Sequence, residues 1–182
     1  MIDTIVQWSV KDYHKIIETG ILSGRRVELI TGNIIEMSPE GSIHRFINHR
    51  GTKYLRSILG KKAEVMEAHP ITLKDSEPEP DISIVRSPDT LYLNHHPYPE
   101  DIYWLIEISD RTLARDLGSK KNIYQEAGIK EYWIIDIGSQ TLKVFHNPSE
   151  KGYQIERSYT DGMVYPLAFP SLAISVNQLM GR

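Results

Sequence analysis

The chain has 182 residues and contains no cysteine. Disulfide bonds, thiolate metal sites and cysteine nucleophiles are therefore excluded, as is a secreted fold held together by disulfides. No apolar run approaches the roughly 20 residues that a helix needs to cross a bilayer. The first residues, Met1-Ile2-Asp3-Thr4, lack the basic region and apolar run of a signal peptide. We therefore expect a cytoplasmic protein that has no membrane partner.

Repeats, low-complexity tracts and linkers are also lacking, and there is no helix-turn-helix or zinc-finger signature. Hydrophobic residues make up 40% of the chain and charged residues 25%, which is ordinary for a globular protein. We therefore predict a single domain over residues 1–182. The net charge of -3 and the isoelectric point near 6.2 argue mildly against indiscriminate binding to nucleic acid. Contact with phosphates would have to come from a local basic patch.

The segment Asp101–Ser109 reads as a buried strand because it is rich in β-branched, aromatic and aliphatic residues. It contains one misplaced charge, Glu107. A buried carboxylate without a partner destabilises the fold or has its pKa shifted upward. Glu107 therefore needs a partner, and either a metal cation or a lysine would serve.

The rest of the chain predicts an α/β fold with a mixed central sheet flanked by helices. Helices are expected after the capping box Ser9–Asp12, from 42 to 59, and from 116 to 127. Residues 86–99 are rich in Pro, His, Asn and Tyr and indicate a loop or flap. Strands are expected in a hairpin at 27–37 with Gly32-Asn33 at its tip, and at 64–67, 71–73, 81–85, 132–136, 141–146 and 153–156.

The helix expected at 42–59 divides into an apolar stripe and a basic stripe. Residues 44–62 include six Lys or Arg and no acidic residue. This surface could bind the phosphates of a nucleic acid, or it could be an ordinary solvated helix face. The apolar stripe consists of Ile47, Gly51, Tyr54, Leu55 and Ile58, and the basic stripe of Arg45, His49, Lys53 and Arg56.

Four residues are candidates for chemistry: Glu28 on the hairpin, Asp81 at the start of a strand, Glu107, and Lys120 on the next helix. Helical spacing places Lys120 on the apolar face that must pack on the sheet. The neighbouring Lys121 lies toward the edge of that face, and we expect it to be solvated.

Carboxylates grouped with a lysine suit metal-dependent hydrolysis of a phosphodiester. Mg²⁺ prefers oxygen ligands, and a bound divalent metal polarises a phosphoryl oxygen and lowers the pKa of a bound water. The lysine would stabilise developing charge or orient the attacking water. A buried network of ion pairs in which these groups only neutralise one another explains the same residues.

Taken in order, these segments resemble a bacterial restriction-endonuclease-like family within the PD-(D/E)XK nuclease superfamily. The resemblance extends from about Ser9 to Leu179. Each motif is weak alone, and the motifs become specific through their order. They are the hairpin Val27–Pro39, His44, Glu79–Val85, Leu105–Ser109, the Asp116-x-x-x-Lys120 helix and Tyr124–Asp136.

The resemblance implies a restriction-endonuclease-like fold and Mg²⁺-dependent endonucleolytic cleavage of DNA, with Mn²⁺ as an alternative ion. Asp81 and Glu107 would bind the metal, with the carbonyl of Ile108 as a third ligand. Glu28 would complete the acidic site, and Lys120 would replace the superfamily's usual lysine. By analogy we expect a homodimer, because cutting both strands of a duplex suits two-fold symmetry.

The sequence departs from the superfamily pattern Glu-x-Lys, because Ser109 stands two residues after Glu107. The assignment therefore depends on Lys120. The family's Ser-Pro becomes Ser109-Asp110, and the Asp-Gly of its hairpin becomes Thr31-Gly32.

The histidines are harder to assign. His44 could lie near the site at a helix N-terminus and contact nucleic acid together with the basic stripe, or it could serve only in packing. His95 and His96 are interpreted as flap residues, since adjacent histidines in a loop rarely form a defined site by themselves.

Two other functions remain open. One is a catalytically inactive nuclease fold that binds nucleic acid or a protein partner. The other is a structural or interaction protein in which Asp81, Glu107 and Lys120 form only an ion network.

Overall fold

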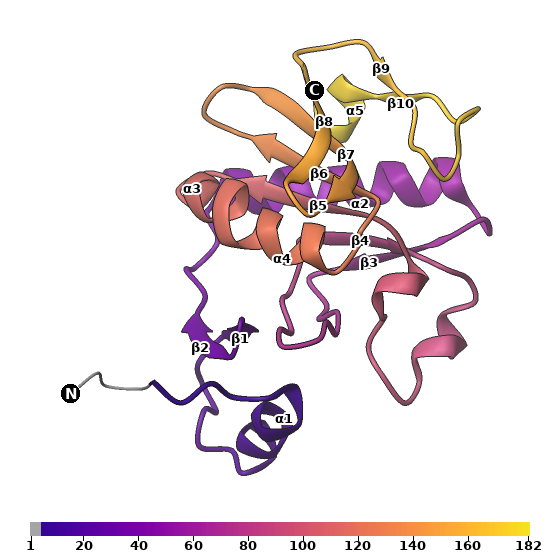
Figure 1. Ribbon diagram of the computed structural model, residues 1–182. Helices are drawn as coiled ribbons and strands as arrows, with labels where there is room; N and C mark the ends of the chain where they lie inside the picture. The colour runs from indigo at the N-terminus through magenta and orange to yellow at the C-terminus, as the bar shows by residue number, and fades with distance from the viewer. Residues whose placement is uncertain (1–4) are drawn as a thin grey trace.

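A computed structural model describes residues 5–182, so the prediction made from Met1–Thr4 lies outside the described residues. Six strands form a mixed sheet in the order β3-β4-β5-β6-β7-β8 (Figure 1). Strands β5 and β6 are parallel, and the other neighbours are antiparallel. The predicted mixed sheet is confirmed, and its strands are β3 (Glu64–Glu67), β4 (Ile82–Val85), β5 (Ile102–Ser109), β6 (Glu131–Asp136), β7 (Thr141–Ser149) and β8 (Gly152–Tyr159).

One face of the sheet packs against the long helix α2 (Ser42–Leu59), whose bounds are those predicted. Trp104, Ile106 and Ile108 alternate along β5 and point into this core, since successive side chains of a strand face opposite sides. The C-terminal elements cover the same face: β9 (Met163–Val164), β10 (Ile174–Ser175) and α5 (Val176–Leu179).

The opposite face carries a continuous helical segment that holds the predicted lysine. It consists of α3 (Leu113–Arg115), a π-helical turn, η3 (Asp116–Lys120), and α4 (Lys121–Glu126). The helix therefore begins three residues before the predicted start. Gly128 follows it with a φ of +76°, a conformation that glycine adopts without strain.

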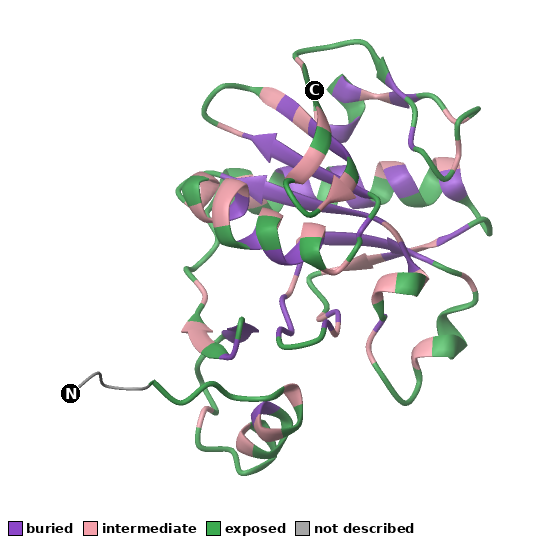
Figure 2. Cartoon of the chain, viewed as in Figure 1, coloured by how far each residue is buried: buried purple, intermediate pink, exposed green. Residues whose placement is uncertain are grey.

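The N-terminal part forms a separate layer (Figure 1). Helix α1 (Val10–Glu18) is capped by Ser9, whose hydroxyl accepts the N–H of Asp12 at 3.1 Å. Strands β1 (Val27–Ile30) and β2 (Asn33–Glu36) form the predicted hairpin. Its tip is Thr31-Gly32, both with positive φ, whereas Gly32-Asn33 was expected. Figure 2 shows that β1 is buried while α1 is largely exposed.

The strand predicted at 71–73 is wrong. Ile71 and Leu73 are buried, but residues 71–73 are not assigned to a strand in the described part of the chain. The N–H groups of Ile71 and Thr72 donate instead to the loop carbonyls of Pro78 and Pro97. The loop predicted at 86–99 is confirmed and includes the 3-10 turn η1 (Asp89–Tyr92); the 3-10 turn η2 (Pro99–Asp101) leads into β5. None of the described helices is long and apolar enough to span a membrane.

Gly51 lets α2 approach α5 closely. A Cβ at this position would lie 2.9 Å from the carbonyl oxygen of Leu179. Gly51→Ala should therefore lower the free energy of unfolding by about 1–3 kcal/mol, against the usual gain in a helix. Urea denaturation measures this change. Gly118→Ala is the control, since its Cβ would meet nothing within 4 Å. Equal stability of both variants would contradict the close-packing account.

Candidate active site

Sheet register brings two of the predicted carboxylates together. Ile82 on β4 pairs with Ile106 on β5 in an antiparallel ladder. Continuing the register by one residue sets Asp81 opposite Glu107, with both side chains on the sheet face that α4 covers. Asp81 and Glu107, which lie 26 positions apart in sequence, are therefore neighbours at the start of β4.

Lys120 meets Glu107 from the covering helix. Its Nζ lies 2.9 Å from Oε1 of Glu107, and both side chains are almost completely buried. The hydroxyl of Tyr124, one turn further along, donates to the same oxygen at 2.8 Å. Of the two partners considered for Glu107, a lysine or a metal cation, the structure places the lysine Lys120 against it.

Glu28 enters the same cluster from the hairpin. It is fully buried, with Oε2 3.4 Å from Nζ of Lys120 and Oε1 3.2 Å from a guanidinium nitrogen of Arg115. Oε2 also accepts the N–H of Glu79 at 3.3 Å. Glu28 is thus held between two cations and the segment that leads into β4.

Asp81 is fixed by two donors. Its Oδ2 accepts the N–H of Ile108 at 2.7 Å, and Nε2 of His44 lies 3.1 Å from the same oxygen. On its other side, Nδ1 of His44 lies 3.3 Å from a carboxylate oxygen of Glu40. His44 therefore sits at the site, at the N-terminal end of α2, as one of the two predicted alternatives has it.

Ser109, which occupies the position of the superfamily's usual lysine, makes a structural contact. Its hydroxyl donates to Oδ2 of the buried Asp116 at 2.7 Å, and the hydroxyl of Thr112 donates to the same oxygen at 2.6 Å. These bonds fasten the end of β5 to the start of the π-helical turn. They fix the register of that turn, at whose end Lys120 faces Glu107.

The cluster borders a cavity of about 420 Å³. Carboxylates and a strand backbone contribute oxygen to its wall, which is the donor type that Mg²⁺ prefers. The N–H of Ile108 bonds to the side chain of Asp81 instead of to a strand, and its carbonyl points to the same side of β5. Asp81, Glu107 and Ile108 all line this cavity and fit a hard divalent cation.

The buried charges perturb one another. Burial raises the pKa of Glu107 to about 8, although Lys120 opposes this shift. Burial lowers the pKa of Lys120, but the surrounding carboxylates outweigh it and raise the pKa above its ordinary value, so the ammonium stays charged. For His44, burial lowers the pKa, while the hydrogen bond and charge of Asp81 raise it above the ordinary value. Burial thus penalises the charged form of Glu107, and the positive charge of Lys120 offsets only part of that penalty.

The predicted basic stripe does not join this cavity wall. Arg45, His49 and Lys53 are exposed along α2. Arg56 instead donates to the carbonyl of Val65 and so binds the edge of the sheet.

The expectation of a solvated Lys121 needs correction. Its Nζ lies 4.0 Å from the centroid of the Phe145 ring and 3.6 Å from Glu156, because β7 and β8 extend far enough to cover it.

Three groups of the site were not predicted to act there. Arg115 precedes the helix start expected from sequence, so nothing indicated that it would face Glu28. No sequence feature indicated that Tyr124 acts in the site, and only the three-dimensional contact shows its hydroxyl on Glu107. Burial raises the pKa of Glu79 while Arg26, 3.6 Å away, opposes the shift. The position of Glu79, two residues before Asp81, is the sequence feature that could have indicated its place in the site.

The carboxylates Glu28, Asp81 and Glu107 do not converge as one compact group. Within residues 5–182, the group of three potential ligand residues whose donor atoms all lie within 4.8 Å of one another is His14, Glu77 and His96. Glu28 is instead directed to cations. Asp81, Glu107 and Ile108 line the cavity, whereas Glu28 does not.

Comparison with protein families gives a match over residues 10–177 to Uma2, described as "Putative restriction endonuclease". The chain belongs to the Uma2 family. No curated protein matches it. A solved structure described as "a putative nuclease belonging to DUF820 from Anabaena variabilis ATCC 29413" is similar in fold, with a TM-score of 0.73 and 20% identity. The similarity covers 95% of this chain and 97% of the other. The restriction-endonuclease-like resemblance seen in the sequence is thus confirmed for this Uma2 protein.

Replacing Lys120 should make stability strongly pH-dependent. In Lys120→Met, Glu107 loses the charge that opposes its raised pKa. In the folded state Glu107 then keeps its proton at pH values above 4.5, where the unfolded state releases it. The free energy of unfolding therefore falls as pH rises. We expect a loss of about 3–5 kcal/mol at pH above 8 and a smaller loss in acid. Urea denaturation across this pH range measures it.

Lys121→Met is the matched control on the adjacent residue. Its ammonium pairs with a half-exposed carboxylate, so its loss should cost less and vary little with pH. The account fails if both variants lose the same stability, or if the loss in Lys120→Met is independent of pH.

Proposed function

We propose that this Uma2 protein is a Mg²⁺-dependent endonuclease that hydrolyses phosphodiester bonds of DNA, with Mn²⁺ able to replace Mg²⁺. The observation that supports this most is the contact of Lys120 with Glu107, 2.9 Å apart beside a cavity that Asp81 also lines. The lysine comes from a helix, and the two carboxylates come from paired strands. Family membership in Uma2 supports the same assignment.

Asp81 and Glu107 would hold the metal ion, with the carbonyl of Ile108 as the third protein ligand. When bound, Mg²⁺ supplies charge that polarises the phosphoryl group and lowers the pKa of a coordinated water. Asp81 is suited to this role because two donors, Ile108 N–H and His44, fix its carboxylate. His44 would act as a positioning residue for Asp81.

Lys120 would orient the attacking water and stabilise the negative charge that develops on the phosphoryl oxygens. Its raised pKa keeps it protonated at neutral pH, which suits charge stabilisation rather than proton abstraction. Glu28 would complete the acidic site by holding Lys120 and Arg115 in place, and Tyr124 would orient Glu107.

DNA contact is proposed for the exposed basic residues Arg45, His49 and Lys53, with Arg56 contributing from the sheet edge. The helix that carries them begins beside the cavity, because His44 lies in both. Phosphate contacts of this kind would position the duplex without reading its sequence. A homodimer would place two cavities on the two strands of a duplex.

A binding module without catalysis is the second candidate. It is favoured by the contacts of Glu28 with both Lys120 and Arg115, which balance buried charge without any metal ion. Such a protein would bind DNA or a partner through the same fold.

Plasmid nicking in the presence of Mg²⁺ tests the proposed activity. Asp81→Asn should lower the rate by about a hundredfold or more, since it removes a metal ligand while preserving shape. Lys120→Ala should do the same, and chelation of the metal should abolish nicking.

Lys121→Ala is the control, because this residue lies on the same helix but does not line the cavity. It should nick at the wild-type rate. Nicking that is equal in the wild type and in Lys120→Ala would overturn the assignment. Metal-dependent DNA binding without nicking would favour the binding module.

A further inference from the structure

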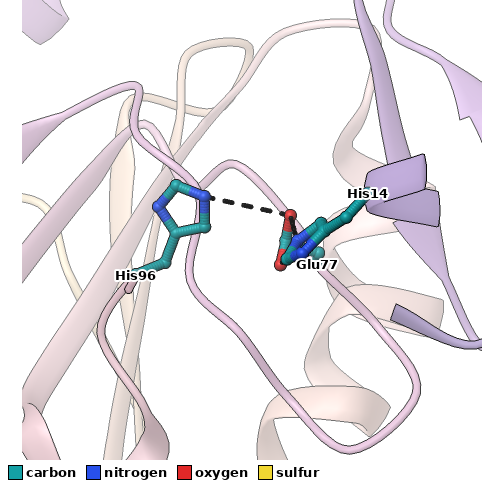
Figure 3. Close-up of side chains that lie close together, drawn as sticks. All are labelled: His14, Glu77 and His96. Carbon is teal, nitrogen blue, oxygen red and sulfur yellow. Dashed lines mark hydrogen bonds and ion pairs between the residues drawn. The ribbon is translucent and has the colours of Figure 1, made fainter. Parts of the chain in front are cut away.

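Three segments that lie far apart in sequence bring metal-binding side chains together outside the cavity. His14 comes from α1, Glu77 from the segment before β4, and His96 from the loop at 86–99. Figure 3 shows the two imidazoles directed at the carboxylate from different sides. Nε2 of His14 lies 2.8 Å from each oxygen of Glu77, and Nε2 of His96 lies 4.0 Å from Oε1.

The carboxylate is held in place before any ion arrives. The backbone of Glu77 exchanges hydrogen bonds with Leu29 of β1, and its side chain is buried. Thr72 donates its hydroxyl to Oε2 of Glu77 at 2.9 Å, and its N–H donates to the carbonyl of Pro97 at 2.9 Å. One residue thereby fixes both the carboxylate and the backbone next to His96. This is the outer support that metal ligands usually have.

The geometry points to a second metal site: we propose that His14, Glu77 and His96 bind one divalent transition-metal ion, with Zn²⁺ the best fit. Two imidazoles and one carboxylate form a common zinc ligand set, whereas Mg²⁺ and Ca²⁺ prefer oxygen. Both histidines are partly exposed, with side-chain exposures of 47% and 43%, so a water can take the fourth position.

The movement needed is small. Ligand atoms in a tetrahedral zinc site are about 3.4 Å apart for bonds near 2.1 Å. His14 would therefore withdraw from Glu77 by about 0.6 Å, and His96 would approach it by about the same amount. Rotation of exposed side chains on a short helix and a loop supplies such shifts. The bound ion would then fasten α1 and the loop at 86–99 to the segment that leads to Asp81.

Titration with Co²⁺ tests this site, because cobalt with few ligands has visible absorption bands that report its geometry. The chelator-treated full chain should bind one equivalent with these bands, and Zn²⁺ should displace it. His14→Ala and His96→Ala should each weaken Co²⁺ binding by about tenfold or more. Glu77→Gln should do so too, while keeping the shape of the side chain.

His95→Ala is the matched control, since it removes the neighbouring imidazole, whose Nδ1 contacts only the carbonyl of His96 in the hydrogen bonds of the described residues. It should bind Co²⁺ as the wild type does. Asp81→Asn should also retain the bands, which separates this site from the proposed nuclease centre. Thermal melting without metal checks that each variant is folded.

The proposal is overturned if folded His14→Ala and His96→Ala bind Co²⁺ as tightly as the wild type. It is equally overturned if the bands are absent from the wild type or vanish in Asp81→Asn alone. The nicking assay tests Asp81 and Lys120, whereas this titration tests His14, Glu77 and His96. An absence of nicking would therefore not change the result expected from the titration.

Discussion

The buried ion pair between Lys120 and Glu107 is the interaction around which the fold is arranged. A carboxylate inside a central strand is tolerated only if a cation reaches it. The cation comes from the helical segment that follows the strand, and this requires the short connection that Ser109 and Asp116 anchor. The hydroxyl of Tyr124 donates a second hydrogen bond to the carboxylate of Glu107. The helical segment that carries Lys120, the end of β5 and the hairpin that carries Glu28 therefore all contact this buried charge cluster.

The same pair bears on the proposed metal site. Burial raises the pKa of Glu107 to about 8 even with Lys120 present, so the desolvation penalty on this carboxylate outweighs the charge of the lysine. Glu28 adds a further carboxylate on the other side of the lysine. In the proposed site, a divalent cation at Asp81 and Glu107 would offset this penalty further, and Lys120 would remain available for the phosphate.

Much of this could be predicted from the sequence, because the relevant signals are local. The bounds of α2 follow from the alternation of apolar and basic stripes, and the inward position of Lys120 follows from helical spacing. The buried character of β5 follows from its composition.

What could not be predicted depends on contacts between distant segments. The stretch at 71–73 reads as a strand because its residues are apolar and β-branched, yet within the described residues its N–H groups donate to loop carbonyls. The role of Arg115 depends on where a π-helical turn begins. The convergence of His14 and His96 on Glu77 requires helix α1, the segment before β4 and the loop at 86–99 to meet, which no local pattern encodes.

The two proposed metal sites share one short segment of the chain. Glu77 and Asp81 are four residues apart, and the prolines between them restrict the backbone. Glu79, midway, accepts a hydrogen bond from Lys120 at its carbonyl, 3.5 Å away, and donates its N–H to Glu28. The segment before β4 therefore supports the proposed catalytic carboxylate from one end and the histidine cluster from the other.

The central claim is that Asp81 and Glu107 hold a divalent cation beside Lys120. Anomalous X-ray scattering from crystals grown with Mn²⁺ tests it most directly, since it locates the ion without assuming activity. The account predicts a peak bound by both carboxylates and by the carbonyl oxygen of Ile108, with Lys120 in place next to it. A Mn²⁺-saturated crystal with no peak at these residues would contradict the account.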